Sequence, residues 1–380
     1  MKATKLTALG IAAGMGIAGV SQAFAYPDVE PRGRLHIDAG FHDEDNVDMD
    51  DGFLNRRARL GLGGDLDELW DFRIEADFSE EGVSAADFRL RRSLNVGRIT
   101  LGQTKVPMGL NQLTSSNSIT FIERATPQNI VPDSRRMGVF YDVSEGMFTF
   151  QSALYGRAIG DDEDGDMPLG VAGRFVASPE LGGGQILHLG VSAAYEDFDS
   201  DSDYRTLGFS DRPESRPAGV RLINTGDIDA DSTTKYGLEL AYIAGPFSAE
   251  AEYVNVDVDR DNGNDVSFDG YHAQVSYVLT GESRSYSSGG FGGITPQGTG
   301  GAWEVAARYS HMDLNDRDIR GGEQDSITLG LNYYHSSNLR FMGNVIFTDV
   351  KDSDAVADLT GNGVDEDSPT TFLARMQYNF

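Results

Sequence analysis

Hydrophobic and polar residues alternate with a period of two along most of the 380-residue chain. Successive side chains of a β-strand point to opposite faces, so this alternation predicts strands whose two faces differ in polarity. Clear examples are the segments 35–41, 70–78, 236–242, 247–253, 303–309 and 372–380. Helical periodicity is nearly absent, and about sixteen strand segments can be distinguished, which predicts an all-β protein.

In each segment one face is apolar and the other carries ionised side chains. A soluble sandwich would bury the apolar face in a shared core, whereas a transmembrane barrel turns it to lipid and lines a water-filled lumen with the polar face. Aromatic residues near many strand ends, the absence of cysteine and the N-terminal segment favour the barrel. Residues 26–380 are therefore predicted to form one transmembrane antiparallel β-barrel of about sixteen strands, wide enough for an aqueous channel.

The N-terminal segment has the three parts of a secretory signal peptide. Lys2 and Lys5 precede an apolar stretch over residues 6–20, and the small residues Ala23 and Ala25 follow it. We expect cleavage after Ala25, because the stretch is too short and wrongly flanked for the alternative, a retained membrane anchor. Together with the barrel pattern, this predicts the outer membrane of a Gram-negative bacterium.

Composition narrows the possible functions. The formal net charge is −29, and removing residues 1–25 takes away two lysines and no acid, which leaves 29 − 60 = −31. Such an acidic protein is not expected to bind nucleic acid, which requires a basic surface. Because the chain has no cysteine, disulfides, thiolate nucleophiles and zinc–cysteine sites are excluded.

Enzymatic motifs are missing as well. The six histidines show no metal-ligand spacing, and no G-x-S-x-G elbow occurs. No catalytic residue, cofactor or resident metal is therefore predicted, although a serine and a histidine brought together by folding, as in a barrel lipase, stay an alternative. Asp257, Asp259 and Asp261 have the spacing of a calcium loop, but Gly263 comes one position late and Phe268 stands where the last acid belongs.

The connections between strands differ on the two sides of the predicted barrel. If both termini face the periplasm, the acidic connections fall on the outside, where they are expected to be solvated, and short turns fall on the inside. The acidic stretches are 43–51, 79–86, 160–166, 196–234, 257–265 and 351–368. Residues 281–301 are an exception, since this long glycine- and serine-rich link falls on the side of the short turns.

One connection stands out as functional. A strand beginning near Ile99 must end at Val106-Pro107, because proline has no amide hydrogen for a ladder. About thirty residues of small and polar character follow, and loops of this length are usually functional. We expect residues 105–135 to form the third extracellular loop, folded back into the lumen as a constriction.

Arginines gather in two predicted wall strands. Arg57, Arg59, Arg89 and Arg91 have the parity of the lumen, whereas Arg56 and Arg92 have the parity of the lipid face and require a bulge, a strand end or an interfacial position there. These side chains could simply pair with Asp71, Glu75 and Asp77 in the wall. As a cluster facing the loop from Lys105 to Arg124, they would instead form a positive constriction suited to anions.

The order of several segments resembles the phosphate-selective porin family of the porin O and P type. These segments are GRLHIDAGFH, NRRARLGLGGDLDELWDFRIEADFS, LGQTKVPMGLNQLTSSNSITFIER, GFSDRPESRP, GAWEVAARYS and a terminal YNF. The resemblance spans nearly the whole mature chain. It implies a sixteen-stranded outer-membrane barrel, a homotrimer in outer-membrane lipid and lipopolysaccharide, and an arginine- and lysine-lined anion path. Phe380 resembles the terminal signal read by the barrel assembly machinery.

The resemblance also suggests site residues. The positions that match the family's constriction are Arg56, Arg57, Asp87, Ser115, Ser116 and Arg124. Arg212, Arg216 and Arg221 match a ladder of arginines at the pore mouth. Phosphate-binding members have a lysine where this chain has Gln112, a departure that predicts a weaker phosphate site.

The predicted function is passive diffusion of small anions, with phosphate or polyphosphate as the expected solutes, through this constriction. Arg57, Arg59 and Arg124 would bind the anion, with Ser115 and Ser116 as hydroxyl partners. Three alternatives stay open at this point: a general or cation-leaning porin dominated by the acidic loops, a barrel enzyme such as a lipase, and a structural or adhesion barrel with a blocked lumen.

Overall fold

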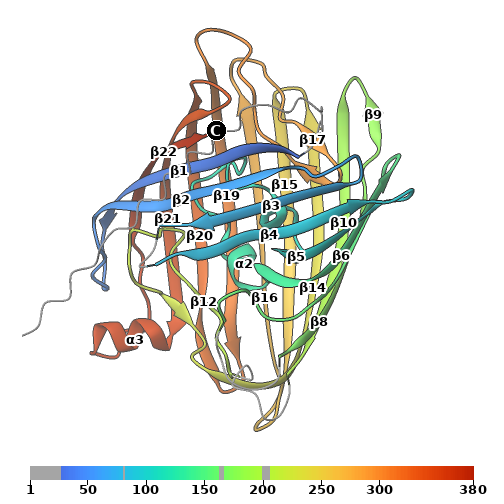
Figure 1. Ribbon diagram of the computed structural model, residues 1–380. Helices are drawn as coiled ribbons and strands as arrows, with labels where there is room; N and C mark the ends of the chain where they lie inside the picture. Colours follow the sequence, from blue (N-terminus) through green and yellow to red (C-terminus); the bar gives the residue numbers. More distant parts are fainter. Residues whose placement is uncertain (1–26, 80–81, 162–166, 199–205) are drawn as a thin grey trace, which may run out of the picture.

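The computed structural model describes residues 27–79, 82–161, 167–198 and 206–380, so the predicted signal peptide lies outside the described residues. The chain forms a closed antiparallel barrel (Figure 1). Its main sheet has eighteen strands, of which β9 and β11 are fragments of three and two residues, and the other sixteen form the wall. Strand β1 pairs with both β2 and β22, which closes the barrel. The predicted all-β barrel of about sixteen strands is confirmed.

The elements follow one another around the wall in chain order. The wall strands are β1 (Asp28–Asp43), β2 (Gly52–Asp65), β3 (Trp70–Asp77), β4 (Ser84–Ser93), β5 (Arg98–Lys105), β6 (Arg135–Glu145), β7 (Phe148–Tyr155), β8 (Leu169–Ala177), β10 (Gln185–Asp197), β14 (Ile228–Ala244), β15 (Phe247–Arg260), β16 (Val266–Val278), β19 (Ala302–Asp316), β20 (Ile319–Tyr334), β21 (Leu339–Ser353) and β22 (Thr370–Asn379). The short strands are β9 (Glu180–Gly182), β11 (Thr206–Leu207), β12 (Ser210–Asp211), β13 (Ile223–Asn224), β17 (Tyr286–Ser287) and β18 (Gly290–Phe291). The helices are α1 (Leu110–Leu113), α2 (Thr126–Ile130) and α3 (Asp354–Thr360).

The predicted alternation is visible in the wall as two faces of opposite character. In β14, for example, Leu238 is 56% exposed on the outside, whereas Glu239 next to it is 4% exposed and points inward. Because a strand alternates its side chains, this places apolar groups outside and ionised groups inside along the whole wall. Within the described residues, no helix has the length and apolar character needed to cross a membrane.

The two ends of the barrel carry different connections. At the end that holds the C-terminus, the upper end in Figure 1, tight turns such as Gly245-Pro246 join the strands. Gly245 has a φ of 56°, a left-handed conformation that glycine adopts without steric cost. The longer connections lie at the opposite end, where α3 begins with its Ser353 hydroxyl accepting a hydrogen bond from the Val356 amide at 3.3 Å and ends at the left-handed Gly361.

Residues 106–134 connect β5 to β6 and lie against inward-facing side chains of the opposite wall. Strand β5 ends at Lys105, as the Val106-Pro107 pair predicts. Buried side chains from four strands donate hydrogen bonds to carbonyl oxygens of this segment, at distances of 2.5–3.0 Å. These donors are Arg308, Asn332, Arg340, Arg375 and Gln377. The segment has little regular structure of its own, so these wall side chains determine its path.

An apolar cluster inside the barrel joins the connections at the end opposite the C-terminus. It includes Val47 and Met49 from the β1–β2 connection, Val131 from the β5–β6 connection and Leu222 from the β10–β14 connection, each at most 8% exposed. Inward-facing apolar residues of β15, including Val256, complete it. The lumen at this end of the barrel is therefore filled by packed loops, and the open space lies beside β1 to β8.

The exceptional link between β16 and β19 also folds inward. Residues 279–301 contain the β17–β18 hairpin, and Arg284, two residues before β17, donates a hydrogen bond to the Ser118 carbonyl at 2.6 Å. From the wall, Arg174 donates to the Gly289 carbonyl at 2.8 Å. This link is longer than the other connections on its side of the barrel because it extends into the lumen, not outward.

The two arginines with lipid parity lie at a bulge and near a strand end, two of the positions that the pattern allowed. In the β1–β2 ladder, Arg57 pairs with His36 and Asn55 with Ile37, so Arg56 is the extra residue of a β-bulge and its side chain reaches the lumen. Arg92 lies near the end of β4, with its guanidinium 5.4 Å from the centre of the Trp70 ring.

Candidate functional site

A polar cavity of about 560 Å³ lies between the wall formed by β1 to β8, residues 106–134 and the β17–β18 hairpin. Its lining contains ten basic side chains and two acidic ones, Asp87 and Asp142. The basic residues are Arg34, Arg56, Arg57, Arg59, Arg73, Arg89, Lys105, Arg124, Arg135 and Arg174. In a protein of strongly negative net charge, this excess makes the cavity a local region of positive potential.

The eight residues that the sequence singles out for the constriction all line this cavity: Arg56, Arg57, Arg59, Asp87, Lys105, Ser115, Ser116 and Arg124. Four come from the wall strands β2 and β4, one from the end of β5 and three from the following loop. The three arginines predicted for the ladder at the pore mouth do not line the cavity and belong to the β10–β14 connection; they are Arg212, Arg216 and Arg221. Burial and the charges of Arg216 and Arg221 lower the pKa of Arg212, so the three lie close together.

Several of the lining guanidiniums are held by carboxylates. Arg59 Nε lies 2.6 Å from Asp77 Oδ2, and Arg56 Nε lies 2.7 Å from Glu123 Oε1. Arg91, which does not line the cavity, pairs with Asp71 at 2.7 Å. The alternative that wall arginines pair with neighbouring wall carboxylates is therefore correct for Arg91 and for Arg59. Asp77 and Glu123 do not line the cavity, which means that they orient the arginines from the side while the positive charge faces the space.

Arg57 and Arg89 differ from these paired arginines. Among the described residues, neither forms an ion pair, and Nη1 of the 6%-exposed Arg57 has no hydrogen-bond partner. A buried guanidinium without an acceptor is unfavourable, because its desolvation is not compensated. These two side chains are therefore the donors in the cavity best able to bind an anion.

The loop contributes a second set of polar groups. Ser116 Oγ accepts a hydrogen bond from Arg34 at 3.1 Å, and Arg124 donates to the Thr114 carbonyl at 2.7 Å. Lys105 donates to the Gln112 carbonyl. Although Gln112 replaces the lysine that the family resemblance leads us to expect, the Lys105 ammonium thus lies beside that position.

Sequence reasoning missed four basic residues of the cavity: Arg34, Arg73, Arg135 and Arg174. Arg34 and Arg73 had the inward parity of their strands, which was an available signal. Arg135 and Arg174 could not be assigned in this way, because parity alone does not show which part of the lumen a wall residue faces. Arg135 lies 2.8 Å from Asp87 Oδ1, and Arg174 lies 2.8 Å from Glu239 Oε1.

A serine and a histidine, as the enzyme alternative requires, lie close together where the end of β1 meets the β10–β14 connection. Ser215 Oγ lies 2.9 Å from His42 Nε2, and Asp51 Oδ1 lies 3.2 Å from His42 Nδ1, the order of groups found in a hydrolase triad. However, Ser215 is 1% exposed. Because a carbonyl carbon must approach a nucleophilic oxygen to about 3–3.5 Å, this arrangement serves as a link between loops rather than as a nucleophile.

A closed barrel with an apolar outer face and a polar, loop-narrowed lumen defines the protein as an outer-membrane porin, a channel rather than an enzyme. The sequence profile described as Phosphate-selective porin O and P matches residues 29–380. The chain belongs to this family, and its place is the outer membrane.

Individual relatives agree with this assignment. A protein of Caulobacter vibrioides is 30% identical over 328 residues, which cover 82% of this chain and 66% of that protein. Porin O of Pseudomonas aeruginosa is 28% identical over an alignment 411 residues long, and this alignment covers 97% of this chain and 91% of the relative. The anion-selective porin from Comamonas acidovorans has a TM-score of 0.57 and 16% identity, covering 93% of this chain and 99% of that one, a likeness of fold alone.

Proposed function

We propose that this porin conducts small oxyanions, with phosphate-sized anions as its preferred solutes, through the arginine-lined cavity. The observation that supports this most strongly is the composition of the lining, ten basic side chains against two acidic ones. Porin O, a relative across nearly the whole chain, and the anion-selective porin of the same fold are consistent with it.

The mechanism follows from the two classes of arginine. A hydrated anion that enters the cavity loses part of its water, and the free guanidiniums of Arg57 and Arg89 replace those contacts with charge-assisted hydrogen bonds. Ser115 and Ser116 offer neutral hydroxyl donors on the loop side. The paired arginines Arg56 and Arg59 contribute positive electrostatic potential but no strong binding contact. The anion can therefore leave again, as conduction requires.

Gln112 makes the proposed site weaker than one with a lysine at that position. The Lys105 ammonium donates to the Gln112 carbonyl and to the Thr114 carbonyl at 3.3 Å, so part of its bonding capacity is already used. We therefore expect phosphate to bind in the millimolar rather than the micromolar range while anion preference is kept.

The rival function is a general or cation-leaning pore. It would apply if the acidic connections at the mouth, rather than the cavity, dominated the potential along the path. The short range of electrostatics in salt solution, about 8 Å at physiological ionic strength, favours the cavity, because an ion inside it is closest to the arginines. The family resemblance also predicts a homotrimer, which stays a prediction.

Reversal potentials of single channels in a potassium chloride gradient test the proposed function. We expect a reversal toward the chloride equilibrium potential and a chloride current blocked by millimolar phosphate. A reversal toward the potassium potential, with no block by phosphate, would identify the cation-leaning alternative. A correctly folded barrel without measurable current would instead indicate a blocked lumen.

Anion preference should fall as the pH rises from 5 to 7. Burial raises the pKa of Asp211, on the β10–β14 connection, to about 6, and Asp211 accepts a hydrogen bond at 3.0 Å from Asn129, which lines the cavity. The carboxyl group is neutral below this pKa and repels anions above it. The expected change in the anion-to-cation permeability ratio is about sevenfold, since a negative charge about 7 Å from an ion raises the free energy of an anion and lowers that of a cation by about 0.6 kcal/mol each in water.

The variant Asp211→Asn should remove this pH step, whereas Asp48→Asn, which removes an exposed loop acid, should keep it. Reversal potentials of the three proteins at several pH values provide the comparison. A step of equal size in the Asp211→Asn variant would assign the titration to another group.

A further inference from the structure

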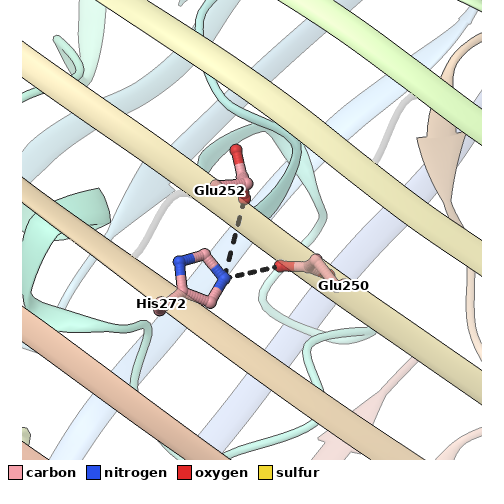
Figure 2. Close-up of side chains that lie close together, drawn as sticks. All are labelled: Glu250, Glu252 and His272. Atoms are coloured by element: carbon pink, nitrogen blue, oxygen red, sulfur yellow. Dashed lines mark hydrogen bonds and ion pairs between the residues drawn. The ribbon is translucent and has the colours of Figure 1, made fainter.

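Two buried carboxylates and an imidazole meet on the inner wall, away from the arginine-lined cavity. Glu250 and Glu252 are inward-facing neighbours on β15, and His272 on β16 is paired directly with Glu252 across the ladder. The Nε2 atom of His272 lies 3.0 Å from Glu250 Oε1 and 3.8 Å from Glu252 Oε1, between the two carboxylates (Figure 2). The three residues are 4%, 3% and 1% exposed.

The charge of this group is not balanced as it is elsewhere in the lumen. Five other buried acids inside the barrel have an arginine or a lysine as a partner: Asp38 with Arg375, Glu196 with Lys235, Glu214 with Arg308, Glu239 with Arg174, and Glu304 with Arg284. Within the part of the chain that the structure describes, Glu250 and Glu252 have ion-pair contacts only with His272. Two buried carboxylates with one imidazole are costly unless a further positive charge is bound.

Unpartnered polar atoms surround the same place. Asn111 and Gln274 donate their amide groups to Glu250 at 2.8 and 3.1 Å, while their amide oxygens are buried and have no hydrogen-bond partner. The Nδ1 atom of His272 is also buried without a partner. Nitrogen and oxygen of an amide exchange places by a rotation about the last side-chain bond, so the two oxygens can turn toward the carboxylates if a cation lies between them.

We infer that Glu250, Glu252 and His272 form a binding site for one divalent transition-metal cation of the zinc class, with the side-chain oxygen of Asn111 as the fourth ligand and Gln274 hydrogen-bonded to Glu250. The two nitrogen–oxygen separations, 3.0 and 3.8 Å, bracket the edge of about 3.4 Å expected for a tetrahedron with bonds of about 2.1 Å. A 2+ ion balances the two carboxylates, and mixed imidazole and carboxylate ligands favour zinc-like ions over magnesium or calcium.

Such a site would hold the constriction loop. Glu252 accepts hydrogen bonds from the backbone amides of Leu110 and Asn111, both at 2.7 Å, at the start of α1. A cation bound to the same carboxylate and to the Asn111 side chain would join β15, β16 and the loop at one point. The inference goes beyond anion conduction, because it concerns a cation that would hold the loop in place, not the anions that pass through the cavity.

Zinc binding to the purified, detergent-solubilised barrel tests the inference. After treatment with a chelator, addition of zinc chloride and removal of free metal, we expect one zinc per chain by elemental analysis. His272→Ala and Glu250→Gln should each weaken zinc binding by at least about tenfold. His311→Ala is the matched control, since His311 with Glu323 and Asp325 is the other histidine–carboxylate group close enough to share an ion among the described residues. It should leave the bound zinc in place.

Two results would overturn the inference. A wild-type barrel that retains no zinc would show that a proton, not a metal, neutralises the carboxylates. Equal zinc retention in wild type, His272→Ala and Glu250→Gln would place any bound metal elsewhere. Heat-modifiable migration in gels identifies variants that have not folded, and using two substitutions in different residues keeps the test decisive if one fails. Neither result bears on ion selectivity, so the proposed anion conduction is tested separately.

Discussion

Replacing both Arg57 and Arg89 with glutamine is expected to remove most of the anion preference and to weaken block by phosphate about 10- to 100-fold. Three lining arginines, Arg57, Arg89 and Arg124, have no ion pair among the described residues. Arg124 already donates to the Asn111 and Thr114 carbonyls, so the hydrogen-bonding capacity of Arg57 and Arg89 is the one free for an anion. A hydrogen bond to a charged group contributes about 1.5–3 kcal/mol, which corresponds to that range for the loss of one such contact. Single-channel reversal potentials and phosphate titrations measure both quantities.

The control changes the net charge by the same amount at other places. Arg32 and Arg320 are 43% and 49% exposed and do not line the cavity, so Arg32→Gln/Arg320→Gln should leave selectivity and phosphate block nearly unchanged. Equal losses in both double variants would mean that overall charge, not the cavity, governs selectivity. Unchanged block in Arg57→Gln/Arg89→Gln would contradict the assignment of these two arginines as anion-binding groups.

The second large effect is expected for Arg375→Met. Arg375 is 2% exposed and lies 2.6 Å from Asp38 Oδ1 and 2.9 Å from Glu123 Oε1, and it also donates to the Ile122 carbonyl. Its removal leaves the fully buried Asp38 without compensation and releases the loop, at a cost of about 3–5 kcal/mol in the free energy of unfolding. Urea unfolding in detergent micelles, followed by tryptophan fluorescence, measures this loss.

A second substitution separates charge from packing. In Arg375→Met/Asp38→Asn the buried carboxylate is no longer charged, so part of the lost stability should return. If the double variant is as unstable as Arg375→Met alone, the cost arises from the lost contacts to the loop carbonyl and Glu123. In either protein the conductance should rise, because the loop that narrows the lumen loses one of its attachments.

The barrel could be derived from the sequence because its pattern is local. Alternation around Leu238 and Glu239 fixes which side chain faces outward, and nothing distant is needed to decide it. The same parity indicated that Arg56 required a bulge, a strand end or an interfacial position, and a bulge is present in the β1–β2 ladder. The end of β5 before Pro107 followed from the missing amide hydrogen alone.

Part of the candidate site could be derived in the same way. Parity placed Arg57 and Arg59 inside, and the family resemblance added Ser115, Ser116 and Arg124. The balance between free and paired arginines could not be derived, because it depends on which carboxylates lie next to each guanidinium. Asp77 holds Arg59, while Arg57, two positions earlier, has no such partner.

The wall follows from the sequence alone: the pattern shows which residues form strands, which side chains face lipid and where the longest connections lie. How the lumen is filled depends on the folded arrangement of the whole chain. Residues 279–301 resemble an ordinary flexible link until Arg284 joins Ser118, and Glu250 and His272 are unremarkable until adjacent strands pair them. The physical reason is that strand faces follow from neighbours in sequence, whereas hydrogen bonds and charges inside the barrel come from residues that only the closed sheet brings together.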